Sequence, residues 1–171
     1  MNESAVYVYL LPDDSPEPRP QRLLRLAAVY AAERGLPAGG FALRRTERGK
    51  PFFPERPEIC FSLSHSGGLW AAAFYSLPLG VDIQRHQPAD CAALARRWFS
   101  AEEYALVREQ GAAAFFAIWC AKESWLKHSG AGIGDHMRLF SVVENNALAA
   151  ICGGKQLQHL PCPPGYSLAV C

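Results

Sequence analysis

A marked excess of either charge, a long apolar stretch and closely spaced cysteine pairs are all missing from this chain of 171 residues. Its 17 basic and 16 acidic side chains nearly cancel, so neither a polybasic nucleic-acid binder nor an acidic disordered tail is expected. The longest uninterrupted apolar run, residues 112–121, is too short to span a bilayer. The first residues lack the cationic region that opens a signal peptide. We therefore expect a cytoplasmic protein that binds neither nucleic acid nor a membrane.

The six cysteines lie far apart in the sequence, without a C-x-x-C pair. This spacing excludes the usual zinc knuckles and dithiol redox motifs, and we expect buried, reduced thiols instead. Half of the residues are hydrophobic and 11% are aromatic, which is enough apolar area for a folded core. The length suits one domain or two small fused halves.

Hydrophobic periodicity predicts both strands and helices. Runs of alternating, branched or aromatic residues predict strands at residues 6–10, 59–65, 69–76, 79–84, 139–144, 147–152 and 166–171. Helical spacing and capping residues predict helices at residues 23–34, 90–97 and 112–128, with a further one between Ser100 and Gly111. The proline-rich stretch 12–21 should be a loop, and the strands between residues 59 and 84 should form an antiparallel meander.

Each half of the chain therefore combines helix with antiparallel strands. We predict an α+β protein of two pseudo-symmetric halves, residues 1–86 and 87–171, each a helix packed on a small antiparallel sheet. The active site should lie in the cleft between the halves. Since two fused halves make their own cleft, a monomer suffices.

Asp82 places a carboxylate in the middle of a short, otherwise apolar strand. By strand parity Asp82 and Gln84 share one face, whereas Val81 and Ile83 face the core. A buried carboxylate needs a cation or strong donors to compensate its charge. The partner is either an arginine that is near in sequence (Arg85, Arg96 or Arg97) or a divalent ion. Mg²⁺ prefers oxygen ligands, which Asp82, the amide carbonyl of Gln84 and a further carboxylate would supply.

Glu123 is the candidate for that further carboxylate. It lies on the helix at 112–128, on a partly exposed stripe with Phe116, Cys120 and Lys127. The neighbouring stripe is expected to be buried and consists of Phe115, Ile118, Trp119, Trp125 and Leu126. Alternatively, Glu123 forms an ordinary i,i+4 ion pair with Lys127, worth about 0.3–0.5 kcal/mol. An acid among lysines on a semi-enclosed face also suits a polyphosphate bridged by a metal ion.

Ser64 and His65 precede a glycine-containing turn, Ser66 to Gly68. Backbone N–H groups in such a turn, together with these two side chains, are able to hold a phosphate. The alternative for His65 is a turn or core histidine that is satisfied by the backbone. Upstream, Gly49, Lys50 and Pro51 form a turn that by itself indicates only a solvated loop.

Taken in order along the chain, these segments resemble the 4'-phosphopantetheinyl transferases of the surfactin-activating type. The resemblance is carried by RTERGKPFF, FSLSHSGGLWAAAF, GVDIQ, WFSAEEY and FFAIWCAKESWLKHSGAGI, from about Arg45 to Ile133, and by the final YSLAVC. The last of the long segments contains a Trp-x-x-Lys-Glu-Ser helix, residues 119–124. The resemblance implies transfer of the phosphopantetheine arm of coenzyme A, as co-substrate, to a serine of an acyl or peptidyl carrier protein, with release of adenosine 3',5'-bisphosphate.

The resemblance also implies a role for each matching residue. Asp82 and Glu123 match magnesium ligands, and Gln84 stands at a position that is often acidic in the family, which makes it a candidate third ligand. The implied contacts to coenzyme A come from Lys50, Pro51, Ser64, His65 and Lys127, the last at the pyrophosphate. Glu123, Lys127 and Glu103 are the candidate catalytic residues, and Glu103 matches an acid that helps to activate the carrier serine. As the third residue of a helix capping box, Glu103 has the alternative of bonding the backbone of Ser100.

Two further functions use the same residues. A Mg²⁺-dependent hydrolase of coenzyme A or nucleotides would need the same metal pocket but no carrier protein. A non-catalytic relative would bind coenzyme A or a carrier protein without transfer. The surface near Trp98 and Phe99 carries Arg96, Arg97 and Arg108, which are candidates for docking an acidic carrier protein. Arg19, Arg22 and Arg25 are candidates for binding the 3'-phosphate, or else simply belong to a solvated helix start.

Overall fold

A computed structural model describes residues 5–130 and 135–171 of the chain. Within these residues the helices are α1 (Arg19–Glu33), α2 (Cys91–Trp98), α3 (Ala101–Gln110), α4 (Ala112–Ser129) and the 3-10 helix η1 (Asp135–Leu139). The strands are β1 (Tyr7–Pro12), β2 (Arg44–Arg45), β3 (Pro51–Phe52), β4 (Cys60–Ser66), β5 (Leu69–Tyr75), β6 (Val81–Arg85), β7 (Val143–Glu144), β8 (Ala147–Leu148), β9 (Ile151–Cys152), β10 (Lys155–Gln156), β11 (Gln158–His159) and β12 (Tyr166–Val170). Every strand pairing is antiparallel, so the predicted α+β class is confirmed.

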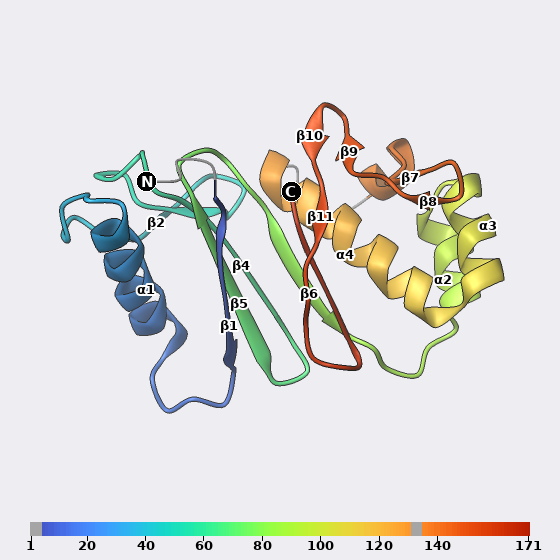
Figure 1. The fold of residues 1–171 in the computed structure, drawn as a ribbon, viewed down its shortest axis with the longest axis horizontal. Coiled ribbons are helices and arrows are strands. Elements are labelled where there is room, and N and C mark those ends of the chain that lie inside the picture. The colour runs from blue at the N-terminus through green and yellow to red at the C-terminus, as the bar shows by residue number, and fades with distance from the viewer. Residues whose placement is uncertain (1–4, 131–134) are drawn as a thin grey trace.

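The first three-stranded sheet has the order β1-β5-β4 and is covered on its outer face by α1 (Figure 1). Helix α1 buries Leu23, Leu26 and Tyr30 against this sheet, where Phe61 and Phe74 belong to the same core cluster. The rings of Tyr30 and Phe74 stack with their centroids 5.6 Å apart. Aromatic contacts of this kind fix the angle at which a helix lies on a sheet.

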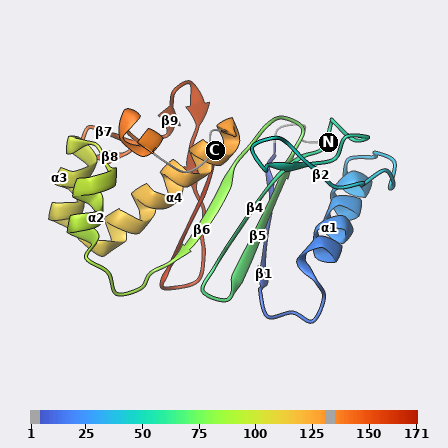
Figure 2. The same ribbon diagram turned by 180° about the vertical axis from the view of Figure 1, so that it is seen from behind.

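The second three-stranded sheet has the order β11-β12-β6 and packs against α4, while α2 and α3 lie on the far side of that helix (Figures 1 and 2). Helix α4 is therefore covered on two faces. Phe116, Cys120 and Glu123 are buried, although the sequence predicted a partly exposed stripe for them. Trp119 and Trp125, predicted to be buried, are only half-buried. Periodicity cannot distinguish two covered faces from one.

The predicted meander at residues 59–84 is wrong for its third strand. β4 and β5 do form a hairpin, but β6 pairs with β12, with Asp82 opposite Ala169. Gly80 lies just before β6, where a Cβ atom would come within 1.9 Å of the carbonyl oxygen of Ser124 on α4. The absence of a side chain there lets the start of β6 approach α4 closely, which brings Asp82 near that helix.

Other predicted elements differ in their boundaries. Helix α1 begins four residues earlier than predicted, at Arg19, because Pro18 and Pro20 fall at the N-cap and in the first turn, where proline is tolerated. Of the predicted strand at 139–144 only β7 forms, and the predicted strand at 147–152 is split into β8 and β9, which belong to the separate hairpins β7-β8 and β9-β10. Three of the six cysteines are buried and three are half-buried. Among the described residues, no helix is both long and apolar enough to cross a bilayer.

Candidate active site

Asp82 is only 5% exposed, and its two carboxylate oxygens have different surroundings. Oδ1 accepts hydrogen bonds from Ser64 Oγ at 2.7 Å and from Lys127 Nζ at 2.6 Å. Oδ2 is buried and has no partner among the described residues. The cation that compensates Asp82 is thus Lys127 and none of the arginines that the sequence offered. One oxygen is held in place and the other is free to bind a ligand.

Glu123 is 3% exposed, and its Oε1 atom is likewise buried without a partner in the described part of the chain. Burial, followed by the charge of Asp82, raises the pKa of Glu123 to about 7, although the charge of Lys127 opposes the rise. Lys127 forms its ion pair with Asp82, so the i,i+4 pair with Glu123 that the sequence allowed is not formed. Asp82 and Glu123 therefore lie near enough to repel each other.

The Cys120 thiol lies near Asp82. It donates to the carbonyl oxygen of Ser167 at 3.2 Å. Burial, followed by the nearby charge of Asp82, raises its pKa well above the ordinary value of 9.0. The thiol therefore stays protonated at neutral pH and does not act as a thiolate ligand.

A hard divalent cation fits this pair of carboxylates. Two buried carboxylate oxygens without a donor, Asp82 Oδ2 and Glu123 Oε1, are the ligands that Mg²⁺ prefers, and burying them unpaired is costly. Gln84, two residues along β6, is half-buried. The described residues include no group of three His, Cys, Asp or Glu side chains that could hold a metal. Any further ligands would accordingly be an amide oxygen or water, both usual for Mg²⁺.

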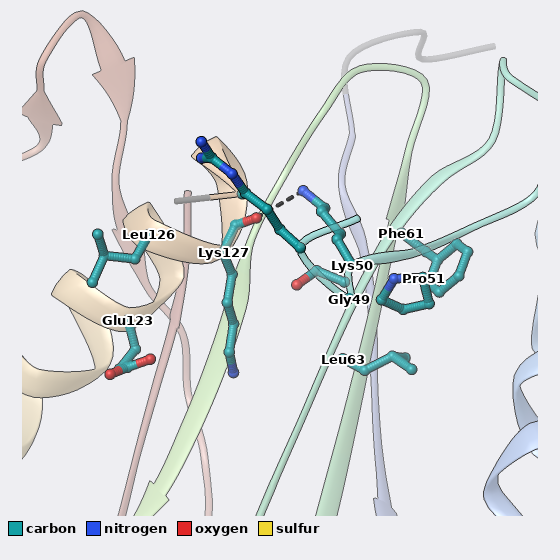
Figure 3. A pocket seen from close by; sticks show the side chains of 11 residues that line it. Gly49, Lys50, Pro51, Phe61, Leu63, Glu123, Leu126 and Lys127 are labelled. Carbon is teal, nitrogen blue, oxygen red and sulfur yellow. Dashed lines mark hydrogen bonds between the residues drawn. The ribbon is translucent and has the colours of Figure 1, made fainter. Parts of the chain in front are cut away.

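A pocket of about 240 Å³ opens beside Glu123 (Figure 3), and neither Asp82 nor Gln84 lines it. Gly49, Lys50 and Pro51 line one side of it, and Glu123 and Lys127 of α4 line the other. The pocket thus brings the turn that carries Lys50 and Pro51, two predicted coenzyme A contacts, together with the helix that carries the predicted catalytic residues Glu123 and Lys127. These segments are more than 70 residues apart in the sequence.

Lys50 has a structural partner that the sequence did not reveal. Its Nζ donates to the carbonyl oxygens of Lys127 at 2.7 Å and His128 at 3.2 Å, at the C-terminal end of α4 (Figure 3). A lysine at this position satisfies carbonyls that have no partner within the helix and favours the negative end of the helix dipole. Burial also lowers the pKa of Lys50. Lys50 therefore fastens the loop at residues 46–51 to α4.

Replacing Lys50 with methionine should lower the free energy of unfolding by about 1–2 kcal/mol, because the last carbonyls of α4 lose a charged donor. Urea unfolding measures the change. Arg48→Ala is the matched control, since Arg48 is exposed on the same loop and its loss should change stability by less than about 0.5 kcal/mol. Equal stability of the Lys50→Met variant and the wild type would refute the capping role.

Ser64 and His65 are adjacent on β4 but have different surroundings. Ser64 is buried, donates its hydroxyl proton to Asp82 and accepts from the backbone N–H of Ile83 at 3.2 Å. His65 is exposed, at the far end of the strand, where its charge lowers the pKa of Asp13, although less than the hydrogen bond from Arg19 does. The contacts of both residues to coenzyme phosphates stay predictions.

Glu103 does not line the pocket beside Glu123. It is fully buried, and both of its oxygens accept hydrogen bonds from Lys122 Nζ, at 2.7 and 2.8 Å. Oε2 also accepts from Ser100 N and Oε1 from Val142 N, each at 2.8 Å. The capping box that the sequence indicated is therefore present. The catalytic role of Glu103 stays a prediction.

Sequence reasoning missed three contributors. Lys122 had no role assigned from the sequence, but it is fully buried and also donates to the carbonyl oxygen of Phe140 at 2.6 Å. Arg48 and Leu63 line the pocket. The complete burial of Lys122 is what marks its role, and burial is known only once the fold is known. Arg48 directly precedes the Gly-Lys-Pro turn. This position in the sequence could have indicated a basic residue near a bound phosphate.

The arginines at the start of α1 are already engaged by acids. Arg19 donates to both carboxylate oxygens of Asp13, and Arg25 to both of Glu17. Arg22 is buried and donates to the carbonyl oxygen of Pro12 at 2.7 Å. They are therefore not a simply solvated helix start, and their binding of a 3'-phosphate stays a prediction. On α2, the guanidinium of Arg97 lies 4.7 Å from the centre of the Trp98 ring.

Comparison with known proteins identifies related sequences. A 4'-phosphopantetheinyl transferase from Bacillus subtilis is 36% identical over 124 residues, which cover 70% of this chain and 54% of the relative. The 4'-phosphopantetheinyl transferase Sfp of Bacillus subtilis strain 168 is 34% identical over 139 residues, covering 73% of this chain and 60% of the relative. HetI from Nostoc sp. PCC 7120 is 34% identical over 117 residues, covering 63% and 49%. The chain thus spans about half to three fifths of the length of these relatives.

A model of the 4'-phosphopantetheinyl transferase superfamily matches residues 78–171. The matched region starts just before β6 and includes all of α4, so it contains both Asp82 and Glu123. It makes up more than half of the chain. The chain therefore belongs to the 4'-phosphopantetheinyl transferase superfamily, and its relatives are of the surfactin-activating type that its motifs predicted.

Proposed function

We propose that this chain transfers 4'-phosphopantetheine from coenzyme A to a serine of an acyl or peptidyl carrier protein, with release of adenosine 3',5'-bisphosphate. The observation that carries the proposal is the pair of buried carboxylates, Asp82 and Glu123, each with an oxygen that lacks a donor, beside Lys127 and a pocket. Family membership supports the reaction class. The arrangement of the side chains indicates which residues would carry out the transfer.

Asp82, Glu123 and Gln84 are the residues that would hold Mg²⁺. When bound, such an ion neutralises charge on the pyrophosphate of coenzyme A. Lys127 is 28% exposed at its side chain and sits on Asp82 in the free protein. Its ammonium is then available to swing toward the pocket and stabilise the leaving bisphosphate. The other carboxylate oxygen of Glu123, Oε2, is the acceptor for the proton of the carrier serine.

Glu103 is the second candidate for activating the serine, and the geometry favours Glu123 over it. Four hydrogen bonds from Lys122, Ser100 and Val142 already use both Glu103 oxygens. A base has to lie within reach of the proton that it removes. Glu123 lines the pocket, and we therefore assign the proton transfer to Glu123.

The proposed function also implies an arrangement of the whole molecule around coenzyme A and the carrier protein. We infer two related halves, residues 1–86 and 87–171, with coenzyme A across the cleft between them and its nucleotide near Lys50 and Pro51. Ser64 and His65 lie along the β4 side of that path. One chain would form the whole cleft, so a monomer would suffice for transfer. We infer that it acts in the cytoplasm. The exposed Arg96, Arg97 and Arg108 would receive an acidic carrier protein.

Gln84→Glu should lower the Mg²⁺ concentration that gives the half-maximal transfer rate, because a third carboxylate next to Asp82 adds a negative charge to the metal site. The reason is local, since Gln84 follows Asp82 by two residues on β6 and is half-buried. Transfer rates across a Mg²⁺ titration measure the shift. An unchanged half-maximal concentration would show that Gln84 does not ligate the metal.

Mass spectrometry of an added apo carrier protein, incubated with the chain, coenzyme A and Mg²⁺, tests the function. We expect the carrier protein to gain one phosphopantetheine arm at a single serine. Cleavage of coenzyme A without a carrier protein would instead select the hydrolase. Coenzyme A binding by calorimetry, with neither cleavage nor transfer, would select the non-catalytic relative.

A further inference from the structure

Strand β4 contacts β6 through a ladder of serine hydroxyls in place of backbone pairing. Ser62 Oγ accepts from Val81 N at 3.0 Å, Ser64 Oγ from Ile83 N at 3.2 Å and Ser66 Oγ from Arg85 N at 3.0 Å. The steps of two residues on each strand show that β4 and β6 run parallel here. This serine ladder (Ser62, Ser64 and Ser66) joins the two sheets and leaves β6 free to pair with β12 on its other edge.

Ser64 differs from the other two members of the ladder because it also contacts a carboxylate. A backbone N–H only donates, so Ser64 Oγ is the acceptor for Ile83. An ionised carboxylate only accepts, so the single Ser64 proton goes to Asp82 Oδ1, 2.7 Å away. Ser64 is thereby fixed at both ends inside the protein, where it is 8% exposed. Its one proton is thus engaged by Asp82.

We propose that Ser64 is a positioning residue for the metal site. It holds Oδ1 of Asp82 in place, so that Oδ2, which has no partner among the described residues, stays free beside Glu123 to bind the cation. The inference deepens the proposed function and rests on it, since it assumes that Asp82 is a ligand. Lys127 also contacts Oδ1, but its side chain is 28% exposed, whereas the Ser64 hydroxyl is buried and has two partners.

Partners that orient a metal ligand change metal affinity when they are lost, typically by 10- to 100-fold. A serine that merely contacted a coenzyme phosphate would leave metal affinity unchanged in the absence of the coenzyme. If a serine only joined two strands, replacing it would change metal affinity no more than replacing the other members of the serine ladder. Metal binding without coenzyme A therefore separates the positioning role from both of these roles.

The test is titration of the full chain with Mn²⁺, a spectroscopic substitute for Mg²⁺, in the absence of coenzyme A. Free Mn²⁺ is followed by electron paramagnetic resonance. Ser64→Ala should weaken Mn²⁺ binding at least about tenfold. Ser62→Ala is the matched control, because Ser62 is similarly buried and bonds Val81 N in the same way, but it has no carboxylate partner. Its Mn²⁺ affinity should stay within about twofold of the wild type, and both variants should lose stability because each leaves a backbone N–H without its acceptor.

Ser64→Thr keeps the hydroxyl and should restore most of the Mn²⁺ affinity, and it also provides a second variant if Ser64→Ala does not fold. Equal Mn²⁺ affinities for Ser64→Ala and Ser62→Ala would overturn the positioning role and leave the proposed function intact. So would a Ser64→Thr variant that is folded but binds as weakly as Ser64→Ala. Absence of Mn²⁺ binding by the wild type would instead remove the cation site of the proposed function, and the role of Ser64 with it.

Discussion

Replacing Glu123 with glutamine is expected to slow phosphopantetheine transfer by about 10²–10⁴-fold, the usual contribution of a positioned base. The variant also loses a charged metal ligand, so the upper part of that range applies. Glutamine has nearly the same shape, and therefore the fold should be kept. Initial rates of carrier-protein mass gain measure the effect, and circular dichroism checks the fold. Near-normal turnover would remove Glu123 from the reaction.

Although Glu123→Gln should slow transfer, it should make the metal-free protein more stable at neutral pH. The pKa of Glu123 is raised from 4.5 to about 7 in the folded chain. As the pH rises between these values, the unfolded chain loses this proton before the folded chain does. The free energy of unfolding should therefore fall by up to about 3 kcal/mol from pH 4.5 to 7 and then level off. Glu123→Gln should remove this dependence, and added Mg²⁺ should reduce it in the wild type.

Replacing Glu103 with alanine should destabilise the fold by about 3–5 kcal/mol, which is the usual cost of removing one partner from a buried ion pair. Lys122 would remain fully buried with its charge uncompensated, and the N–H groups of Ser100 and Val142 would lose their acceptor. Thermal or urea unfolding measures this loss.

A double variant separates the structural from the catalytic role of Glu103. Glu103→Leu combined with Lys122→Met replaces the buried pair with apolar side chains, which often restores stability. If Glu103 serves the fold, the double variant should be more stable than Glu103→Ala and should retain transfer. A stable double variant without transfer would make Glu103 part of the reaction.

Local signals in the sequence were enough to place much of the helical half. Asp90 accepts from Ala93 N, and Ser100 and Glu103 form the predicted capping box. Gly130 adopts the left-handed conformation that ends α4. Each of these features depends on residues within one helical turn, and therefore the sequence is sufficient to predict it.

Features that depend on distant segments were mispredicted. The partner of β6 is β12, which follows it by more than 80 residues, whereas β5 is adjacent and equally strand-like. Nothing in a strand's own residues decides between such partners. The predicted exposed stripe of α4 is buried for a related reason, because the sheet covers one face of the helix and α2 and α3 cover another.

The two carboxylates of the candidate site could be predicted from the sequence, but the residues that hold the site together could not. A carboxylate in an apolar strand and another in a Lys-Glu-Ser helix are visible in the sequence, and the fold places Asp82 and Glu123 near each other. The partner of Lys50 is a helix end that is 77 residues away. The partner of Ser64 depends on the parallel contact of β4 with β6, which no periodicity indicates.

The most direct test of the shared cation site is Mn²⁺ binding by the wild type, Asp82→Asn and Glu123→Gln, each without coenzyme A. Both substitutions keep the size of the side chain and remove one charge. We predict one tightly bound Mn²⁺ per wild-type chain and at least about tenfold weaker binding in each variant. Wild-type affinity in either variant would mean that Asp82 and Glu123 do not hold one ion together, which would contradict the account.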